Sequence, residues 1–245
     1  MLSRRFQAPR YDLSARRGAR EFAYSQLRQL IVSGELEPGT CIAEKDLAAR
    51  LGVSRTPLRE CLEVLDMQGF MTRLPNGRMM IAPLSARDLS DLYATRLAIE
   101  RLIILSVVSK ATDGEIEETL GPIAAGIRSA LERSLPEARV FGERFHYALA
   151  EICPNRVAST ILWELKDRIA LYRRIGPDHS PARRGQAAKD HLHIYELIRR
   201  RRASDAVQVM EEHIRRSQEI AVGFLVRAEP PGSEAAHPAL APISS

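Results

Sequence analysis

The 245-residue sequence predicts a mainly α-helical protein built from two domains. Aromatic residues make up only 5% of the chain, and apolar residues recur with a helical period almost to its end. Weak alternation around an Asn-Gly pair near residue 76 interrupts this pattern and predicts one β-hairpin. The apolar content of 45% can supply two cores. We therefore expect a small helical domain with a hairpin, joined to an all-α bundle of about six helices.

The N-terminal segment 1–19 is basic, and we expect it to be a flexible arm. Residues 1–20 hold six arginines and one acidic residue, Asp12, and they account for most of the formal net charge of +5. Residues 84–245 are close to neutral, with 23 Lys+Arg against 22 Asp+Glu. The arm fits either a disordered leader or a segment that touches DNA.

The first predicted helix follows the arm and ends near Gly34. Its inward face is expected to carry Phe22, Leu27, Leu30 and Ile31. These residues would pack against the helices that come next in the chain.

Two further helices are predicted on either side of a sharp turn at Gly52. The second of them begins with "SRTPLRE", where Ser54 or Thr56 can cap the helix. Its apolar residues recur at i, i+4 and i+7 from Leu58, which leaves Arg55 and Arg59 together on the solvent side. With the hairpin that follows, residues 20–83 make a winged helix-turn-helix.

The remainder of the chain to residue 227 is predicted to be helical. Pro83 ends the hairpin, and Ser85 can cap the next helix. We place helices near 86–110, 113–132, 136–152, 156–175, 182–200 and 203–226. The arginine run 199–202 is interpreted as a solvated helix end. Residues 228–245 are rich in Pro, Ala and Ser, and we expect a disordered tail.

The exposed pair Arg55 and Arg59 requires a counter-charge, because like charges at i, i+4 repel. One interpretation is a solvated surface in which they pair with Glu60 and Glu63. The other is DNA: a helix N-terminus attracts phosphates, and arginine can bind the O6 and N7 atoms of guanine through two parallel hydrogen bonds.

The stretch "AEKDLAARLGVSRTPLREC" followed by the Asn-Gly hairpin resembles the winged helix-turn-helix of GntR-family bacterial transcription regulators. The resemblance covers residues 20–83. It implies contacts between operator DNA and residues on the second helix, the third helix and the wing, namely Lys45, Ser54, Arg55, Thr56, Arg59, Asn76, Gly77 and Arg78.

The second domain, residues 84–227, resembles the FCD effector domain of the FadR-type branch from about residue 88 to 218, in the stretches "LYATRLAIERLIILSVVSKAT", "ERFHYALAEICPNRVA" and "DHLHIYELIRRRRASDAVQVMEEHI". The resemblance implies a ligand-responsive regulator, expected to be a repressor, that binds a near-palindromic operator as a homodimer. It further implies a small organic acid as effector, with Arg96 facing the effector cavity. A surface ion pair between Arg96 and Glu100 is the alternative.

Three histidines match the metal-ligand positions of the family: His146, His191 and His213. Imidazole suits a divalent metal ion, with zinc or nickel favoured here. His179 and His193 match no family position. Metal-binding members carry an aspartate where this chain has Gly142. Glu143 could replace that ligand, or the site could lack a metal.

A metal-dependent enzyme using these histidines is the rival hypothesis, but no HExxH motif, phosphate loop or nucleophile elbow accompanies them, and we expect no enzyme activity. The cysteines Cys41, Cys61 and Cys153 lack close pairs, so we expect buried thiols in a cytoplasmic protein. No apolar run approaches the roughly 20 residues that span a bilayer, and no membrane partner is expected.

Overall fold

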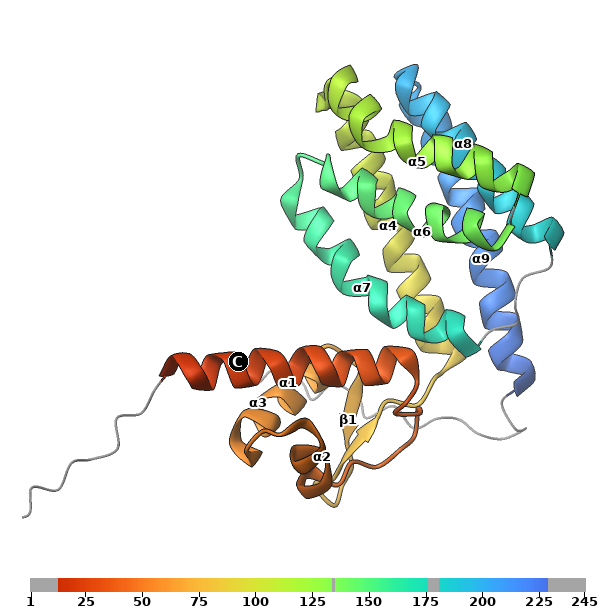
Figure 1. Ribbon diagram of the computed structural model, residues 1–245. Helices are drawn as coiled ribbons and strands as arrows, with labels where there is room; N and C mark the ends of the chain where they lie inside the picture. The colour runs from red at the N-terminus through yellow and green to blue at the C-terminus, as the bar shows by residue number, and fades with distance from the viewer. Residues whose placement is uncertain (1–12, 134, 176–180, 229–245) are drawn as a thin grey trace, which may run out of the picture. The chain divides into compact units, whose positions relative to one another are not determined.

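The computed structural model describes residues 13–133, 135–175 and 181–228 (Figure 1). These residues form two compact units that divide between Pro83 and Leu84. Both units are dominated by helices, which confirms the predicted fold class. Most of the expected arm and the expected tail from residue 229 onward lie outside the described residues.

The N-terminal unit contains three helices followed by a two-stranded antiparallel hairpin: α1 (Leu13–Ser33), α2 (Glu44–Leu51), α3 (Arg55–Met67), β1 (Met71–Arg73) and β2 (Met79–Ile81). Helix α1 packs against α3. It begins at Leu13, inside the segment that we expected to be an arm.

The buried face of α1 agrees with the prediction at Leu27 and Ile31 and differs from it at Phe22. Ala23, Leu27 and Ile31 are fully buried, whereas Phe22 is 50% exposed. The inward stripe therefore follows the spacing i, i+4, i+8 from Ala23, and the inward placement of Phe22 was wrong. This stripe of α1 and the predicted leucines of α3 form part of the unit's core, which residues of α2 and the hairpin complete.

The hairpin has a register in which Met71 pairs with Ile81 and Arg73 pairs with Met79. Gly77 has a φ of 80°, which favours glycine, and it donates its N–H to the Leu74 carbonyl over 2.8 Å. Residues 39–42 run beside β2, where Cys41 forms an isolated bridge with Met80. This extra edge was not predicted, and it leaves Cys41 exposed rather than buried.

The described residues of the C-terminal unit form six helices, each within two residues of its predicted bounds: α4 (Ala86–Lys110), α5 (Asp113–Arg133), α6 (Leu135–Glu151), α7 (Arg156–Ile175), α8 (Pro181–Arg199) and α9 (Ala203–Ala228). Ser85 caps α4 as predicted, because its Oγ accepts a hydrogen bond from Asp88 N over 3.1 Å.

Helix α4 is central to this unit and contacts α9, α7, α6 and α8 (Figure 1). Among the described residues, the core around it is apolar apart from Ser85 and a group of six buried charged or imidazole side chains: Arg96, Glu100, His146, Asp190, His191 and His213. Within the described ranges, no helix is both long and apolar enough to cross a membrane.

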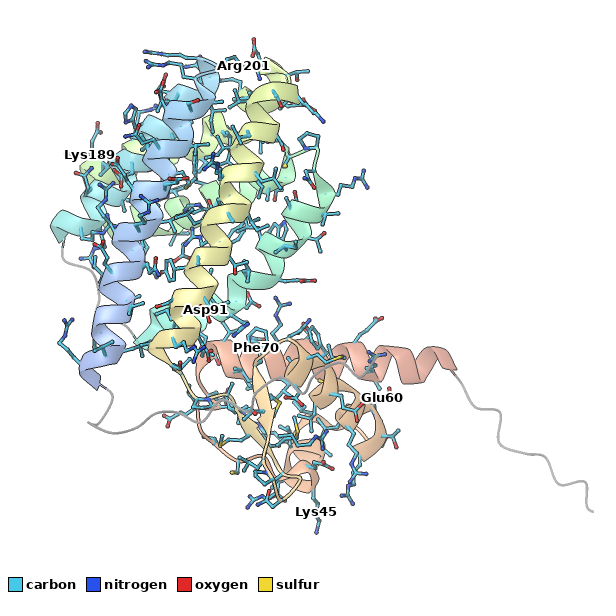
Figure 2. All side chains as sticks on the ribbon, turned by 180° about the vertical axis from the view of Figure 1, so that it is seen from behind. Lys45, Glu60, Phe70, Asp91, Lys189 and Arg201 are labelled. Atoms are coloured by element: carbon cyan, nitrogen blue, oxygen red, sulfur yellow. The ribbon has the colours of Figure 1, made fainter. Side chains whose placement is uncertain are left out.

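The arginine run at the end of α8 is more than a solvated helix end. Arg201, labelled in Figure 2, has a φ of 56° and donates from Nη1 to the carbonyls of Val108 (3.0 Å) and Ala111 (2.7 Å). Its Nη2 pairs with Asp113. The side chain thus satisfies the last carbonyls of α4 and connects the α8–α9 turn to the start of α5.

We predict that Arg201→Ala lowers the free energy of unfolding by about 1–3 kcal/mol, because the variant loses two hydrogen bonds to helix-end carbonyls and an ion pair. The matched control is Arg200→Ala, which removes an exposed neighbour of the same charge and should change stability by less than about 0.5 kcal/mol. Urea unfolding measures both. Equal midpoints for the two variants would contradict the assigned role.

Candidate functional site

The residues expected to touch DNA all lie on the surface of the N-terminal unit. One of them is in the first turn of α2, four lie at the start of α3, and three lie in the hairpin connection. All of them are exposed: Lys45, Ser54, Arg55, Thr56, Arg59, Asn76, Gly77 and Arg78. Figure 2 shows the Lys45 side chain projecting from this unit. Ser54 precedes α3 in an extended conformation, and its side chain makes no capping hydrogen bond.

A carboxylate on another helix pairs with both arginines of α3. Arg59 Nε donates to Glu44 Oε2 over 2.7 Å, and Arg55 Nη2 lies 3.7 Å from the same oxygen. The alternative pairing with Glu60 and Glu63 was therefore wrong about the partner. Helix periodicity cannot reveal Glu44, since it precedes Arg59 by 15 residues and belongs to α2.

The C-terminal unit brings the three predicted histidines together. His146 comes from α6, His191 from α8 and His213 from α9, and all three are buried. One nitrogen of each lies within 4.8 Å of one nitrogen of the others. His193 is exposed and outside this cluster, and His179 lies outside the described residues. The cluster has the nitrogen donors and the compactness that a divalent metal site requires.

Carboxylates hold two of the three imidazole rings, in each case through the Nδ1 atom. His146 Nδ1 lies 2.5 Å from Glu100 Oε2, and His213 Nδ1 lies 3.2 Å from Asp190 Oδ2. His146 Nε2 is therefore left toward the cluster, where it lies 3.1 Å from His191 Nε2. Metal-ligating histidines are commonly held in this way, with a carboxylate on the second ring nitrogen. The residues thus fit a metal ion bound through Nε2 atoms.

Burial and pairing set the protonation states of this cluster. Burial lowers the pKa of His146 to about 4, although Glu100 opposes the shift. Burial also lowers the pKa of His213, against the opposing effect of Asp190. Burial alone would raise the pKa of Glu100, but Arg96 and His146 hold it below its ordinary value. Neutral imidazoles beside ionised carboxylates are the forms that bind a metal ion.

Arg96 is part of the same cluster. Its Nε donates to Glu100 Oε1 over 2.5 Å, and the two side chains are 3% and 2% exposed. The predicted pair with Glu100 thus exists, but its placement on the surface was wrong. The Nη1 atom of Arg96 is buried and has no hydrogen-bond partner among the described residues. A buried donor of this kind is suited to an anionic ligand.

Glu143 and Gly142, which lie close to His146 in the sequence, do not add a ligand to the cluster. Glu143 pairs with Arg139 over 2.9 Å and is 38% exposed, so it does not supply the missing ligand. A Cβ atom at Gly142 would lie 2.8 Å from His191 Cε1 and 2.9 Å from Nδ1. The His191 ring therefore uses the space that the glycine leaves, and an aspartate at position 142 would require that ring to move.

Asp190 is a further member of the site that was not predicted from the sequence. Asp190 accepts hydrogen bonds from Gln186 and Arg216, each over 2.9 Å, in addition to its contact with His213. Its place directly before His191 gave no signal, because neighbouring residues on a helix point in different directions. The contact of Asp190 with His213 could not be predicted without the packing of α8 against α9.

A cavity of about 570 Å³ lies elsewhere in the C-terminal unit. Residues from the end of α4, the α6–α7 junction and α7 line it, including Lys110, Cys153, Arg156 and Trp163. None of the three histidines lines this cavity. The histidine cluster is therefore defined by its buried polar contacts and is separate from this hollow.

Comparisons with known proteins agree with the two-unit architecture. Residues 19–81 match the family model for "Bacterial regulatory proteins, gntR family", and residues 91–216 match the FCD domain. The Nta operon transcriptional regulator of Aminobacter aminovorans is 31% identical over 196 residues, which cover 76% of this chain and 87% of that protein. The HTH-type transcriptional repressor RspR of Escherichia coli is 26% identical over 201 residues, covering 80% and 86%.

Solved structures show the same fold. A GntR transcriptional regulator of Rhodococcus sp. RHA1 superposes with a TM-score of 0.67 at 17% identity, over 84% of this chain and 98% of that one. McbR/YncC of E. coli gives a TM-score of 0.65 at 19% identity, over 84% and 97%.

The contact between Gly142 and His191 gives a stability prediction. Gly142→Ala should be less stable than Gly114→Ala by about 1–3 kcal/mol, because the added methyl group overlaps a buried ring only at position 142. Gly114 is the second residue of α5 and Gly142 lies inside α6, so the gain in helix propensity is larger at position 142 and acts against the predicted difference. Thermal and urea unfolding measure the difference. Identical stabilities would show that the His191 ring moves without cost.

Proposed function

The chain belongs to the GntR family of bacterial transcription regulators and carries its FCD domain, and on that premise we propose that it is a repressor controlled by a small organic acid. We infer that it binds a near-palindromic operator as a homodimer. The observation that carries the proposal is the exposed N-terminal end of α3, where Arg55 and Arg59 lie in the same unit as the exposed wing.

On this proposal the start of α3 enters the major groove. Arg59 and Arg55 contact guanine edges, while Ser54 and Thr56 add hydrogen bonds to phosphates near the helix N-terminus. The wing contributes Asn76, Gly77 and Arg78, and α2 contributes Lys45. The backbone contacts position the protein, and the arginines of α3 supply base preference.

A homodimer is proposed because one recognition helix contacts only a few base pairs. Two copies related by a two-fold axis double the contacts and fix the spacing of the half-sites. Helix α4 offers a surface suited to such an interface, since Leu102 and Leu105 are 41% and 39% exposed. Apolar side chains of this size on one helix gain stability when a second copy covers them.

The effector site is proposed at the buried histidine cluster. His146, His191 and His213 would hold zinc or nickel, which when bound supplies a positive centre for a carboxylate oxygen. Arg96 Nη1 would donate to the same acid. An acid that binds more tightly to the DNA-free arrangement of the dimer than to the DNA-bound one releases the operator.

Selection of bound sequences from random duplex DNA, with and without organic acids, tests the proposed function. We expect enrichment of an inverted repeat containing guanine in each half-site, and loss of enrichment with an active acid. A protein that enriches no sequence at low salt would contradict the proposal.

For the DNA-binding face, we predict that Arg59→Ala weakens operator binding by about 1–3 kcal/mol and relaxes the preference at one base pair. Arg78→Ala should weaken binding to all sequences and reduce the slope of log K against log salt by about 1. Titrations at several salt concentrations separate the two effects. Wild-type binding by both variants would refute the assigned face.

For the histidine cluster, we predict that untagged protein purified without chelator carries close to one equivalent of zinc or nickel. His191→Ala should lose the metal, since a cluster of three nitrogen donors becomes two. His193→Ala is the matched control, because His193 is exposed on the same helix and lies outside the cluster. Elemental analysis measures the content. Metal-free wild-type protein that still responds to its effector would refute the site.

A further inference from the structure

The pairing of Glu44 with both arginines of α3 is not explained by the assignment of those arginines to DNA. One carboxylate oxygen, Glu44 Oε2, lies 2.7 Å from Arg59 Nε and 3.7 Å from Arg55 Nη2. A carboxylate among residues that approach phosphates opposes their attraction to DNA. The presence of Glu44 therefore requires a benefit that outweighs the weaker attraction to phosphates.

The geometry of the contact indicates that effect. Glu44 binds the Nε atom of Arg59, and no other hydrogen bond or ion pair joins Arg59 to the described residues. The two Nη groups therefore stay available. They form the end of the guanidinium fork, which can donate two parallel hydrogen bonds to guanine.

Glu44 is less exposed than the two arginines that it contacts. Its side chain is 26% exposed, against 63% for Arg55 and 58% for Arg59. It lies in the first turn of α2, where the helix dipole favours a negative charge, and Leu47 and Ala48 anchor α2 in the core. Arg59 is thus paired with a side chain that belongs to a second helix, α2.

We propose that Glu44 is a specificity-determining residue that positions Arg59 for guanine and suppresses binding to non-operator DNA. This inference rests on the proposed function. Fixing Arg59 before binding reduces the rotamer entropy lost on the operator. The negative charge weakens the sequence-independent attraction to phosphates, which acts on every site. Both effects raise the ratio of specific to non-specific affinity.

The test compares Glu44→Gln with a control variant that changes the net charge by the same amount. Glu35→Gln is the control, because Glu35 belongs to the same unit and pairs with Arg50 rather than with an arginine of α3. Both variants remove one negative charge from the N-terminal unit. Circular dichroism and thermal unfolding confirm that each is folded.

Affinities for the operator, for the operator with one guanine pair replaced, and for random duplex are measured at several salt concentrations. Glu44→Gln should bind random duplex about three- to tenfold more tightly than wild type, with a steeper salt slope. It should also lose about fivefold or more of the discrimination at the guanine pair. Glu35→Gln should leave that discrimination unchanged. Equal discrimination by Glu44→Gln and wild type overturns the proposal.

A double-mutant cycle with Arg59→Ala shows whether Glu44 acts through Arg59. In the Arg59→Ala background, Glu44→Gln should have no further effect on the guanine preference. A full additional loss overturns the positioning role. The Arg59 Nε–H resonance gives a readout without DNA, and it should exchange more rapidly with water in Glu44→Gln. If wild-type protein selects no sequence, the proposed function fails and this inference fails with it.

Discussion

The chain Arg96–Glu100–His146 is the interaction on which the C-terminal unit depends. Isolated charges at this depth would cost several kcal/mol each, so the guanidinium, the carboxylate and the imidazole must satisfy one another. The contacts extend from α4 to α6 through Glu100, and from α6 to α8 through the pair of His146 and His191. The polar contacts therefore specify how three helices are placed, beyond what apolar packing alone requires.

The same constraint explains the chemistry of the cluster. Burial lowers the pKa of His146 and of His213, and Arg96 and the hydrogen bond from His146 hold the pKa of Glu100 low, so the cluster combines neutral nitrogen donors with fixed negative charge. Gly142 completes this arrangement by leaving room for the His191 ring. The absence of a side chain at position 142 is thus linked to the position of a ring on another helix.

The sequence predicted the helices of the bundle closely because capping residues, prolines and apolar periods are local signals. It also brought His146, His191 and His213 into one site through family resemblance. Side-chain contacts between different helices could not be predicted from the sequence. Asp190 and Glu44 act on residues of neighbouring elements, and their partners are determined by helix packing rather than by spacing. The placement of Phe22 failed for a different reason, since the small residue Ala23 takes the buried position beside it and an apolar pattern favours the larger side chain.

The two candidate sites share one physical device, although they lie in separate units. In the bundle, Glu100 and Asp190 bind the Nδ1 atoms of His146 and His213, which leaves the Nε2 atoms for a ligand. On the winged helix, Glu44 binds the Nε atom of Arg59, which leaves the two Nη groups. In each case a carboxylate occupies the inner edge of a planar group and fixes the plane, so the outer edge meets its ligand with little rotational freedom left to lose. A carboxylate beside a ligand-binding group therefore does more than compete with the ligand. It lowers the affinity somewhat but defines the orientation of the group. That orientation distinguishes one ligand or one base pair from another.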